Sequence, residues 1–460
     1  MHKIRKSFII FIFFNVIVIC TPNFIEAATY YVSTSGSAVW ADCSNTATPC
    51  SWQTAITNAK AGDTVYFRTG VYDPGNAANY DIPAMNPANS GTAGNPIIFK
   101  AYPGESPVLT GNMDGPVIGA FNRNYITWDG FTSTQVDTGG VNFLVGVFQS
   151  NNITIKNCDL TGLNADTHDN NALIFADTAS HLTIENNLIH DSNGLLPGDP
   201  DRIEAAVNSA GIILYSTSYA TVKNNDFYNN YIGIFDKDAG NYNKHYNNHI
   251  WGGAGSDTCY YGVKFGNEQG GGNSTNVEYY QNIIRNCITG IFSEAGAGAF
   301  ESTIISPKIY NNTIIGSGGE WGIFVTTDKA IRSAEIYNNI IMNYDRGPGI
   351  FSSPATYSFV DYNAYNNVTY WNYDGYSGTD YLLLSSWQAA TGYDMHSLTV
   401  SAGFTNLSGS APDDFRLEAS SLLKGNGRGG EDPGAYPSRY TDKIGFKTPR
   451  RPVPVYVNIL

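Results

Sequence analysis

The sequence predicts an all-β protein, a single-stranded right-handed parallel β-helix with an amino-terminal cap and a carboxy-terminal closing segment. Three observations lead to this fold class. Glycine and asparagine each supply 48 of the 460 residues, and both rank low in helix propensity. Only 14% of the residues are charged while 42% are hydrophobic, which excludes a disordered chain. The third observation is an internal repeat between residues 150 and 365.

Each copy of the repeat has an apolar strand ending in Asn, a second short strand, a variable loop, and a third strand that begins Gly-Ile or Gly-Val. Such short strands cannot form sheets of their own, but they pair when successive coils stack about 4.8 Å apart. An Asn at the turn tolerates the left-handed conformation, and its amide, if stacked inward, bonds to the coils above and below. These leading positions are Asn157, Asn186, Asn224, Asn247, Asn311 and Asn338, with Gln281 in one slot. The third-strand glycines are Gly211, Gly233, Gly262, Gly290, Gly322 and Gly349.

The two ends of the chain differ from the repeat. Residues 1–27 combine a basic start with the short apolar run Phe8–Cys20, which predicts a secretory signal peptide. No later segment is apolar enough to cross a bilayer, so we expect a secreted, extracellular protein without membrane insertion. We divide the remainder into an amino-terminal cap with the first coils, a β-helix core and a closing segment, at residues 28–110, 111–370 and 371–460.

Charge and cysteine content limit the partners. The formal net charge is −14 without a basic patch, which excludes a nucleic-acid-binding protein. In an oxidising compartment Cys43 and Cys50, which flank a short loop, are expected to form a disulfide. We expect a monomer.

The Asn column followed by Gly-Ile strands resembles the right-handed parallel β-helix of the pectate-lyase-like superfamily. Residues 29–37, 54–72 and 91–109 resemble the caps of its secreted bacterial members, and residues 385–398 and 414–436 resemble their closing segments. The resemblance implies that polysaccharide binds in a groove along the third strands. It does not fix an activity, because this architecture hosts lyases, hydrolases, epimerases and adhesins. The catalytic motifs of its galacturonan hydrolases, alginate epimerases and pectate lyases are missing, so no catalytic residue is carried over.

Alternation along the third strands predicts which residues face the groove. Counting from each glycine, the second column is Ile213, Phe235, Lys264, Phe292, Phe324 and Phe351. The fourth column is Tyr215, Lys237, Gly266, Glu294, Thr326 and Ser353. The long inserts at 192–209 and 251–259 are interpreted as groove walls, although long loops are also simply tolerated there. The aromatic residues either stack on sugar rings or form a second small core beneath these loops.

Two lysines carry most of the predicted chemistry. Lys237 and Lys264 are expected on adjacent coils, roughly 8 Å apart, and either is a candidate catalytic base. Asp236, Asp238 and Glu268 are candidate ligands of Ca²⁺, which takes several oxygen ligands. The alternative is a solvated cluster of ion pairs. The candidate substrate-binding residues are Tyr215, Phe235, Glu294, Arg202 and Glu204.

The sequence therefore leaves three functions open. The leading hypothesis is a Ca²⁺-assisted lyase that cleaves an acidic polysaccharide by β-elimination. The second is a glycoside hydrolase with two carboxylates about 5–9.5 Å apart, formed by Asp236 or Asp238 with Glu294 or Glu204. The third is a non-catalytic glycan-binding protein or adhesin.

Overall fold

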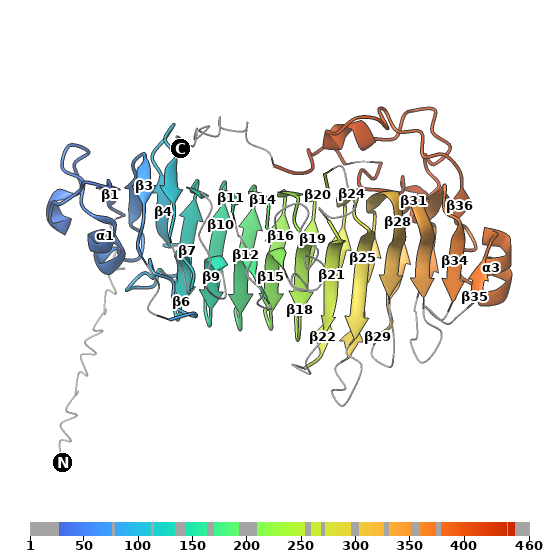
Figure 1. The fold of residues 1–460 in the computed structure, drawn as a ribbon, viewed down its shortest axis with the longest axis horizontal. Coiled ribbons are helices and arrows are strands. Elements are labelled where there is room, and N and C mark those ends of the chain that lie inside the picture. Colours follow the sequence, from blue (N-terminus) through green and yellow to red (C-terminus); the bar gives the residue numbers. More distant parts are fainter. Residues whose placement is uncertain are drawn as a thin grey trace, which may run out of the picture.

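The protein is an elongated parallel β-helix in the computed structural model (Figure 1). The structure describes residues 27–75, 79–111, 115–133, 143–162, 170–192, 209–253, 259–267, 272–295, 303–325, 331–350, 359–373, 379–438 and 440–446. All but the last residue of the predicted signal peptide lies outside these ranges, as do most of the two long inserts. The strands stack as predicted from the amino-terminal end to the carboxy-terminal end, and each coil pairs in parallel with its neighbours.

The first sheet takes one strand from each coil. Its twelve strands are β1 (Thr29–Val32), β2 (Thr64–Phe67), β4 (Ile97–Ala101), β7 (Asn124–Asp129), β10 (Asn151–Lys156), β13 (Thr183–Glu185), β16 (Thr221–Lys223), β19 (Lys244–Tyr246), β23 (Glu278–Tyr280), β27 (Lys308–Tyr310), β30 (Glu335–Tyr337) and β32 (Phe359–Asp361). We call it sheet A.

The second sheet, sheet B, contains two rows of strands. The edge row holds β3 (Gly70–Tyr72), β5 (Pro107–Leu109), β8 (Thr132–Ser133), β11 (Asp159–Thr161), β14 (Leu188–His190), β17 (Asp226–Tyr228), β20 (His249–Trp251), β24 (Ile283–Arg285), β33 (Ala364–Asn366) and β36 (Leu398–Thr399). The groove row holds β6 (Ile118–Phe121), β9 (Phe143–Phe148), β12 (Ala172–Asp177), β15 (Ala210–Tyr215), β18 (Ile232–Lys237), β21 (Tyr261–Asn267), β25 (Thr289–Ala295), β34 (Tyr370–Tyr373) and β35 (Thr379–Tyr381). Two long strands join both rows, β28 (Thr313–Val325) and β31 (Ile340–Ile350).

Smaller elements complete the chain. A third sheet joins β22 (Ser274–Thr275), β26 (Ile304–Ile305) and β29 (Ile331–Arg332). The helices are α1 (Trp52–Asn58) and α3 (Leu384–Thr391), with short 3₁₀ turns at Trp40–Asp42, Pro412–Phe415 and Arg428–Gly430. In the part of the chain described here, no helix is long and apolar enough to span a membrane.

We expected one Asn to form both the turn and the amide ladder. In the Asn pairs that follow several sheet A strands, two successive residues take these roles separately. The leading residue adopts the left-handed conformation, as predicted, with φ of 56° at Asn224. The inward amide ladder is formed instead by the following residue, so that part of the prediction is wrong. In each bond of the ladder one Nδ2 donates to the next Oδ1 at 3.0–3.1 Å, along Asn187, Asn225, Asn248, Asn282, Asn312, Asn339 and Asn363. A left-handed residue turns the chain, and only its successor then points inward.

The glycine column is explained by close approach between coils. A Cβ atom on Gly233 would lie 2.5 Å from the carbonyl oxygen of Gly262 on the next coil. The predicted register holds from Gly211 to Gly322, but not at Gly349. There Ile323 pairs with Pro348 and Phe324 pairs with Gly349, so Gly347 takes the column position.

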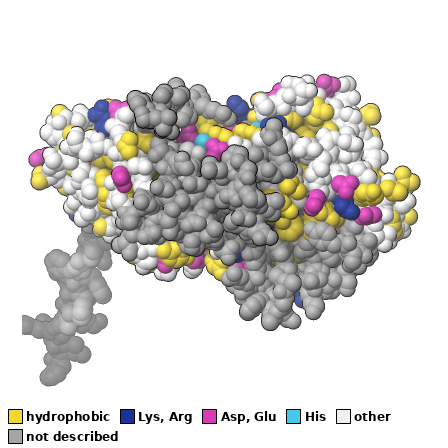
Figure 2. Space-filling view, in the orientation of Figure 1, with side chains coloured by type: hydrophobic (Ala, Val, Ile, Leu, Met, Phe, Trp, Pro, Cys, Tyr) yellow, Lys and Arg dark blue, Asp and Glu magenta, His cyan; other side chains and the backbone are white. Residues whose placement is uncertain are grey.

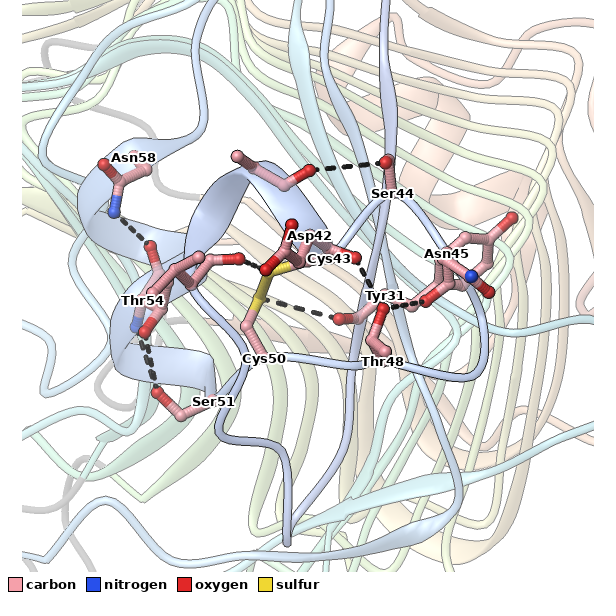
Figure 3. The surroundings of a disulfide bond; sticks show 12 residues. Tyr31, Asp42, Cys43, Ser44, Asn45, Thr48, Cys50, Ser51, Thr54 and Asn58 are labelled. Carbon is pink, nitrogen blue, oxygen red and sulfur yellow. Dashed lines mark hydrogen bonds between the residues drawn. A yellow bond between two sulfur atoms is a disulfide. The ribbon is translucent and has the colours of Figure 1, made fainter.

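The amino-terminal end is closed by α1 and by the predicted disulfide between Cys43 and Cys50, which is confirmed (Figure 3). Ser51 caps α1 by accepting a hydrogen bond from the Thr54 backbone N–H at 3.2 Å. A second disulfide, Cys259–Cys287, links two successive coils and was not predicted.

The carboxy-terminal segment returns along the outside of the coils (Figure 1). The backbone N–H of Gly434 donates to Asn338 O, and that of Gly445 donates to Asn247 O. Arg285 reaches the same segment through the Ser410 carbonyl at 3.1 Å. The closing segment therefore contacts coils well inside the solenoid as well as its end.

Candidate active site on the groove row

The outer face of the groove row has the register that the glycine alignment predicted. Lys264 pairs with Phe235 on one side and with Phe292 on the other. Lys237 pairs with Tyr215 and with Gly266. Each coil thus contributes its second and fourth residue to one outer surface, and neighbouring coils bring these residues within about 4.8 Å of one another.

This outer face is an apolar cluster rather than an open aromatic stripe. Its buried members are Phe143, Phe148, Ala172, Phe175, Ala210, Ile213, Tyr231, Ile232 and Phe235, with Tyr215, Tyr260 and Tyr261 packed against them. Phe235 is fully buried and Tyr215 is half-buried. The alternative of a second small core therefore describes Phe235 better than a sugar-stacking role does, because a buried ring offers no free face.

The two predicted lysines lie within this apolar cluster. Only 1% of Lys237 and 4% of Lys264 is exposed. Both Nζ atoms lie over the same Phe235 ring, 5.4 and 4.7 Å from its centroid. Lys237 Nζ also donates to Asn170 Oδ1 at 2.9 Å. The structure thus brings the two lysines together in buried rather than solvated surroundings.

Among the predicted acidic residues, Asp236 does not face the lysines. Asp236 points into the interior, where Asn243 Nδ2 and His245 Nε2 each lie 3.0 Å from its carboxylate. Asp236 is the third residue after the glycine, so alternation turns it away from the outer face, and we correct its assignment to the groove. Asp238 follows β18 and is fully buried.

The other predicted site residues are not placed. Arg202, Glu204 and Glu268 lie outside the described residues, and Glu294 is described only in its backbone on β25.

The described residues alone do not complete a calcium site, because the candidate ligand Glu268 lies outside them. Ca²⁺ takes six to eight oxygen ligands, and the Asp236 carboxylate is already held by Asn243 and His245. Across the described ranges no three metal-ligating side chains come together. We therefore derive no catalytic step through calcium, and calcium stays a prediction that depends on Asp238 and the unplaced Glu268.

A carboxylate pair that the sequence analysis missed lies on the same face. Asp177 ends β12 and pairs in register with Tyr215, which in turn pairs with Lys237. Burial raises the pKa of the Asp177 carboxyl. Asp81 is close enough that its pKa is raised by burial and also by the negative charge of Asp177. Tyr80, next to Asp81, packs on Phe148 with ring centroids 6.1 Å apart.

Of these two residues, only Asp177 occupies a position that the repeat pattern could have identified. Asp177 has the same strand position as Tyr215 and Lys237, but its coil carries Leu173 where the other coils carry the column glycine. An alignment on glycine therefore skips this coil. Asp81 lies on a loop that has no periodic pattern.

The edge row carries a separate polar cluster. His190 Nδ1 lies 2.7 Å from Asp191 and Nε2 lies 3.0 Å from Asp159. Burial opposes the charged imidazole, but the two carboxylates outweigh it and raise the pKa of His190. Figure 2 shows histidine and acidic side chains among hydrophobic ones at the upper edge of the molecule, where the edge row runs in Figure 1. The His190–Asp191 pair is thus an ion pair at a turn.

Comparisons with known proteins fit this architecture. The family model described as a right-handed beta helix region matches residues 143–341. A pectate lyase, Pel9A, superposes with a TM-score of 0.52 at 16% identity, covering 89% of this chain and 96% of its own. The chain has the right-handed parallel β-helix fold.

Two further proteins of known structure superpose with lower TM-scores. A rhamnogalacturonan lyase gives a TM-score of 0.46 at 14% identity, covering 86% of this chain and 96% of its own. A lacto-N-biosidase of glycoside hydrolase family 136 from Eubacterium ramulus gives 0.43 at 11% identity, covering 74% of this chain and 64% of its own. No curated protein sequence matches the chain significantly. At these identities the likeness concerns the fold alone.

Proposed function

We propose that this β-helix is a secreted enzyme that cleaves an acidic polysaccharide by β-elimination on the outer face of the groove row. The observation that carries the proposal is the juxtaposition of Lys237 and Lys264, two buried lysines on adjacent coils over one aromatic ring. The carboxylate of a uronate residue bound between them accepts hydrogen bonds from two neighbouring amine groups. An anionic sugar is thus the ligand that this charge arrangement favours.

In the proposed elimination Lys237, Lys264 and Asp177 each have a role. One lysine, as the free amine, removes the proton from the carbon next to the uronate carboxylate, while the other, as the ammonium, neutralises that carboxylate. The released electron pair forms a carbon–carbon double bond, and the bond to the glycosidic oxygen breaks. The leaving oxygen takes a proton from Asp177, whose raised pKa suits a general acid. Asp177 and Lys237 lie two coils apart, about 10 Å between Cα atoms, with Tyr215 between them.

A second candidate function, a glycoside hydrolase, is favoured by one observation. Asp81 and Asp177 resemble the carboxylate pairs of glycosidases, in which one acid stays protonated and the other ionises. The shared environment that raises both pKa values supports this assignment. It replaces the pairs built on Asp236, which faces the interior.

Product analysis separates the two reactions. The protein is incubated with polygalacturonate, alginate and a glycosaminoglycan, and both the absorbance of unsaturated products and the release of reducing ends are followed. We expect unsaturated product from at least one polymer, and none from the Lys237→Met/Lys264→Met variant. Reducing ends without unsaturated product, abolished by Asp177→Asn, identify the hydrolase instead.

Two further parts of the proposal have tests of their own. Calcium dependence predicts that a chelator abolishes turnover and that added Ca²⁺ restores it. Secretion predicts that mature protein recovered from a culture medium begins near Ala28, which amino-terminal sequencing measures.

A further inference from the structure

Three exposed aromatic rings form a stack at the border between the groove row and sheet A. His181, Tyr219 and Tyr242 stand on successive coils, four or five residues after Asp177, Tyr215 and Lys237. Their ring centroids are 5.0 and 5.1 Å apart, with interplanar angles of 11° and 7°. Tyr219 is 49% exposed and Tyr242 is 45% exposed. We call these three residues the aromatic strip.

The backbone does not favour aromatic residues at these positions. All three have left-handed φ values of 55°, 57° and 58°. Tyr rarely adopts this conformation, whereas Asn and His adopt it more often. The same column carries Asn152 before the strip and Asn276 after it, both left-handed as well. The turn accepts Asn on either side of the strip, and the strip instead places exposed rings there on three consecutive coils.

Hydroxyl and amide groups border the aromatic strip, and the exposed Lys244, which follows Thr221 in its column, pairs there with Glu278 at 3.6 Å. On one side Thr275 Oγ1 donates to Asn241 Oδ1 at 2.7 Å, and Asn241 Nδ2 donates to Ser218 Oγ at 3.4 Å. On the other side Thr183 and Thr221 begin β13 and β16, half-buried on the outer face of sheet A. The strip thus presents its ring edges among hydroxyl and amide groups, with the Lys244–Glu278 ion pair beside its last ring.

We propose that the aromatic strip is a second carbohydrate-binding surface, which holds a polysaccharide chain through its sugar rings and hydroxyls outside the groove row. Sugar rings offer apolar C–H faces for aromatic side chains and hydroxyls for neutral polar groups, and both are present here. The strip needs no anionic group on the sugar. Its binding is therefore independent of salt, unlike binding at Lys237 and Lys264.

The test uses substitutions that the turn accommodates. Tyr219→Asn/Tyr242→Asn places the residue found at 152 and 276 into the strip, and the matched control Tyr125→Asn makes the same change at a left-handed position outside the stack. Each is made in the Lys237→Met/Lys264→Met background, so that neither turnover nor the lysine site contributes. Retardation in native gels that contain xyloglucan, glucomannan, polygalacturonate or alginate is measured at low and high salt.

We expect at least one polymer to retard the background protein equally at both salt concentrations. The double Asn variant should bind that polymer about tenfold more weakly, and Tyr125→Asn should bind it unchanged. The double Asn variant should also melt at the same temperature as the background protein or above it, which a purely structural stack would not allow. Absence of retardation, equal retardation of the double Asn variant, or equal loss in Tyr125→Asn overturns the proposal. None of these results depends on whether the groove row catalyses elimination.

Discussion

The outer faces of sheet A and of the groove row are built on the same coils but arrange charge in opposite ways. On sheet A one outer column reads Lys100, Asp129, Lys156, Glu185 and Lys223 on successive coils. Opposite charges alternate, with Lys100 and Lys156 both paired to Asp129 and Lys223 paired to Glu185 at 3.1 Å. On the groove row Lys237 and Lys264 are like charges on adjacent coils and are buried. The first pattern alternates opposite charges, whereas the second gathers two cationic side chains that we propose to act on an anionic ligand.

The other side chains in that sheet A column also have their contacts within the protein. Tyr246, Tyr280, Tyr310 and Tyr337 stack at 4.8–5.1 Å between centroids, and the Arg428 guanidinium of the closing segment lies 5.0 Å from the Tyr337 ring centroid. Aromatic stacking alone is thus no sign of a binding site. The strip of His181, Tyr219 and Tyr242 differs because it is exposed and left-handed.

The largest expected effect is a loss of turnover, which should follow substitutions on the groove row and not on sheet A. Lys237→Met and Lys264→Met should each lower turnover at least about 100-fold, because each removes a group that acts in the proton transfer or on the carboxylate. Methionine of similar volume in an apolar cluster should leave the protein folded. Initial rates of product formation measure the effect. Wild-type rates in both variants would remove the lysines from the mechanism.

The Asn pairs offer the next largest effect, on stability. Asn225→Ala removes an amide that donates to Ile184 O and Asn248 Oδ1 and accepts from Asn187. Several buried groups lose their partners, so we expect a loss of about 3 kcal/mol in the free energy of unfolding. Asn224→Gly, its neighbour, keeps the left-handed turn and should cost about 1 kcal/mol or less. Denaturant unfolding of both variants measures the difference, and equal losses would contradict the division of roles.

The buried Asp177 carboxyl should make the melting temperature depend on pH. Burial raises the folded-state pKa of its carboxyl above the unfolded value, so the folded state binds the proton more tightly. Its favourable contribution is present below the unfolded pKa and is lost as pH rises through the folded pKa. Asp177→Asn should therefore melt at a higher temperature than wild type at neutral pH, with the gap closing near about pH 4. The exposed Asp42→Asn serves as the control, and a pH-independent gap would argue against the buried acid.

The smallest effect is expected on sheet A. Lys223→Met breaks the half-exposed ion pair with Glu185 and should change the free energy of unfolding by no more than about 0.5 kcal/mol. Its turnover should match wild type in the same assay that detects Lys237→Met. A loss of turnover in Lys223→Met would show that the lysine effect is not specific to the groove row.

The repeat made the fold predictable because its strands, turns and glycines recur on successive coils. The columns of Phe235, Lys264 and Lys237 followed from alternation alone, and the same rule applied to Asp236 would have turned it inward. Cys259 and Cys287 stand three residues before Gly262 and Gly290, so the alignment already placed them on neighbouring coils. Burial of the lysines was not predictable, because it depends on contacts from outside the repeat, such as that of Asn170 with Lys237.

The central claim is that the groove row recognises an anionic sugar through Lys237 and Lys264. Calorimetric titration with an acidic oligosaccharide and with the same oligosaccharide after reduction of its carboxylates to alcohols tests it most directly. The protein should bind the acidic form and lose about tenfold or more in affinity for the neutral form, and Lys237→Met/Lys264→Met should no longer distinguish the two. Equal affinity of the native protein for both forms would contradict the account.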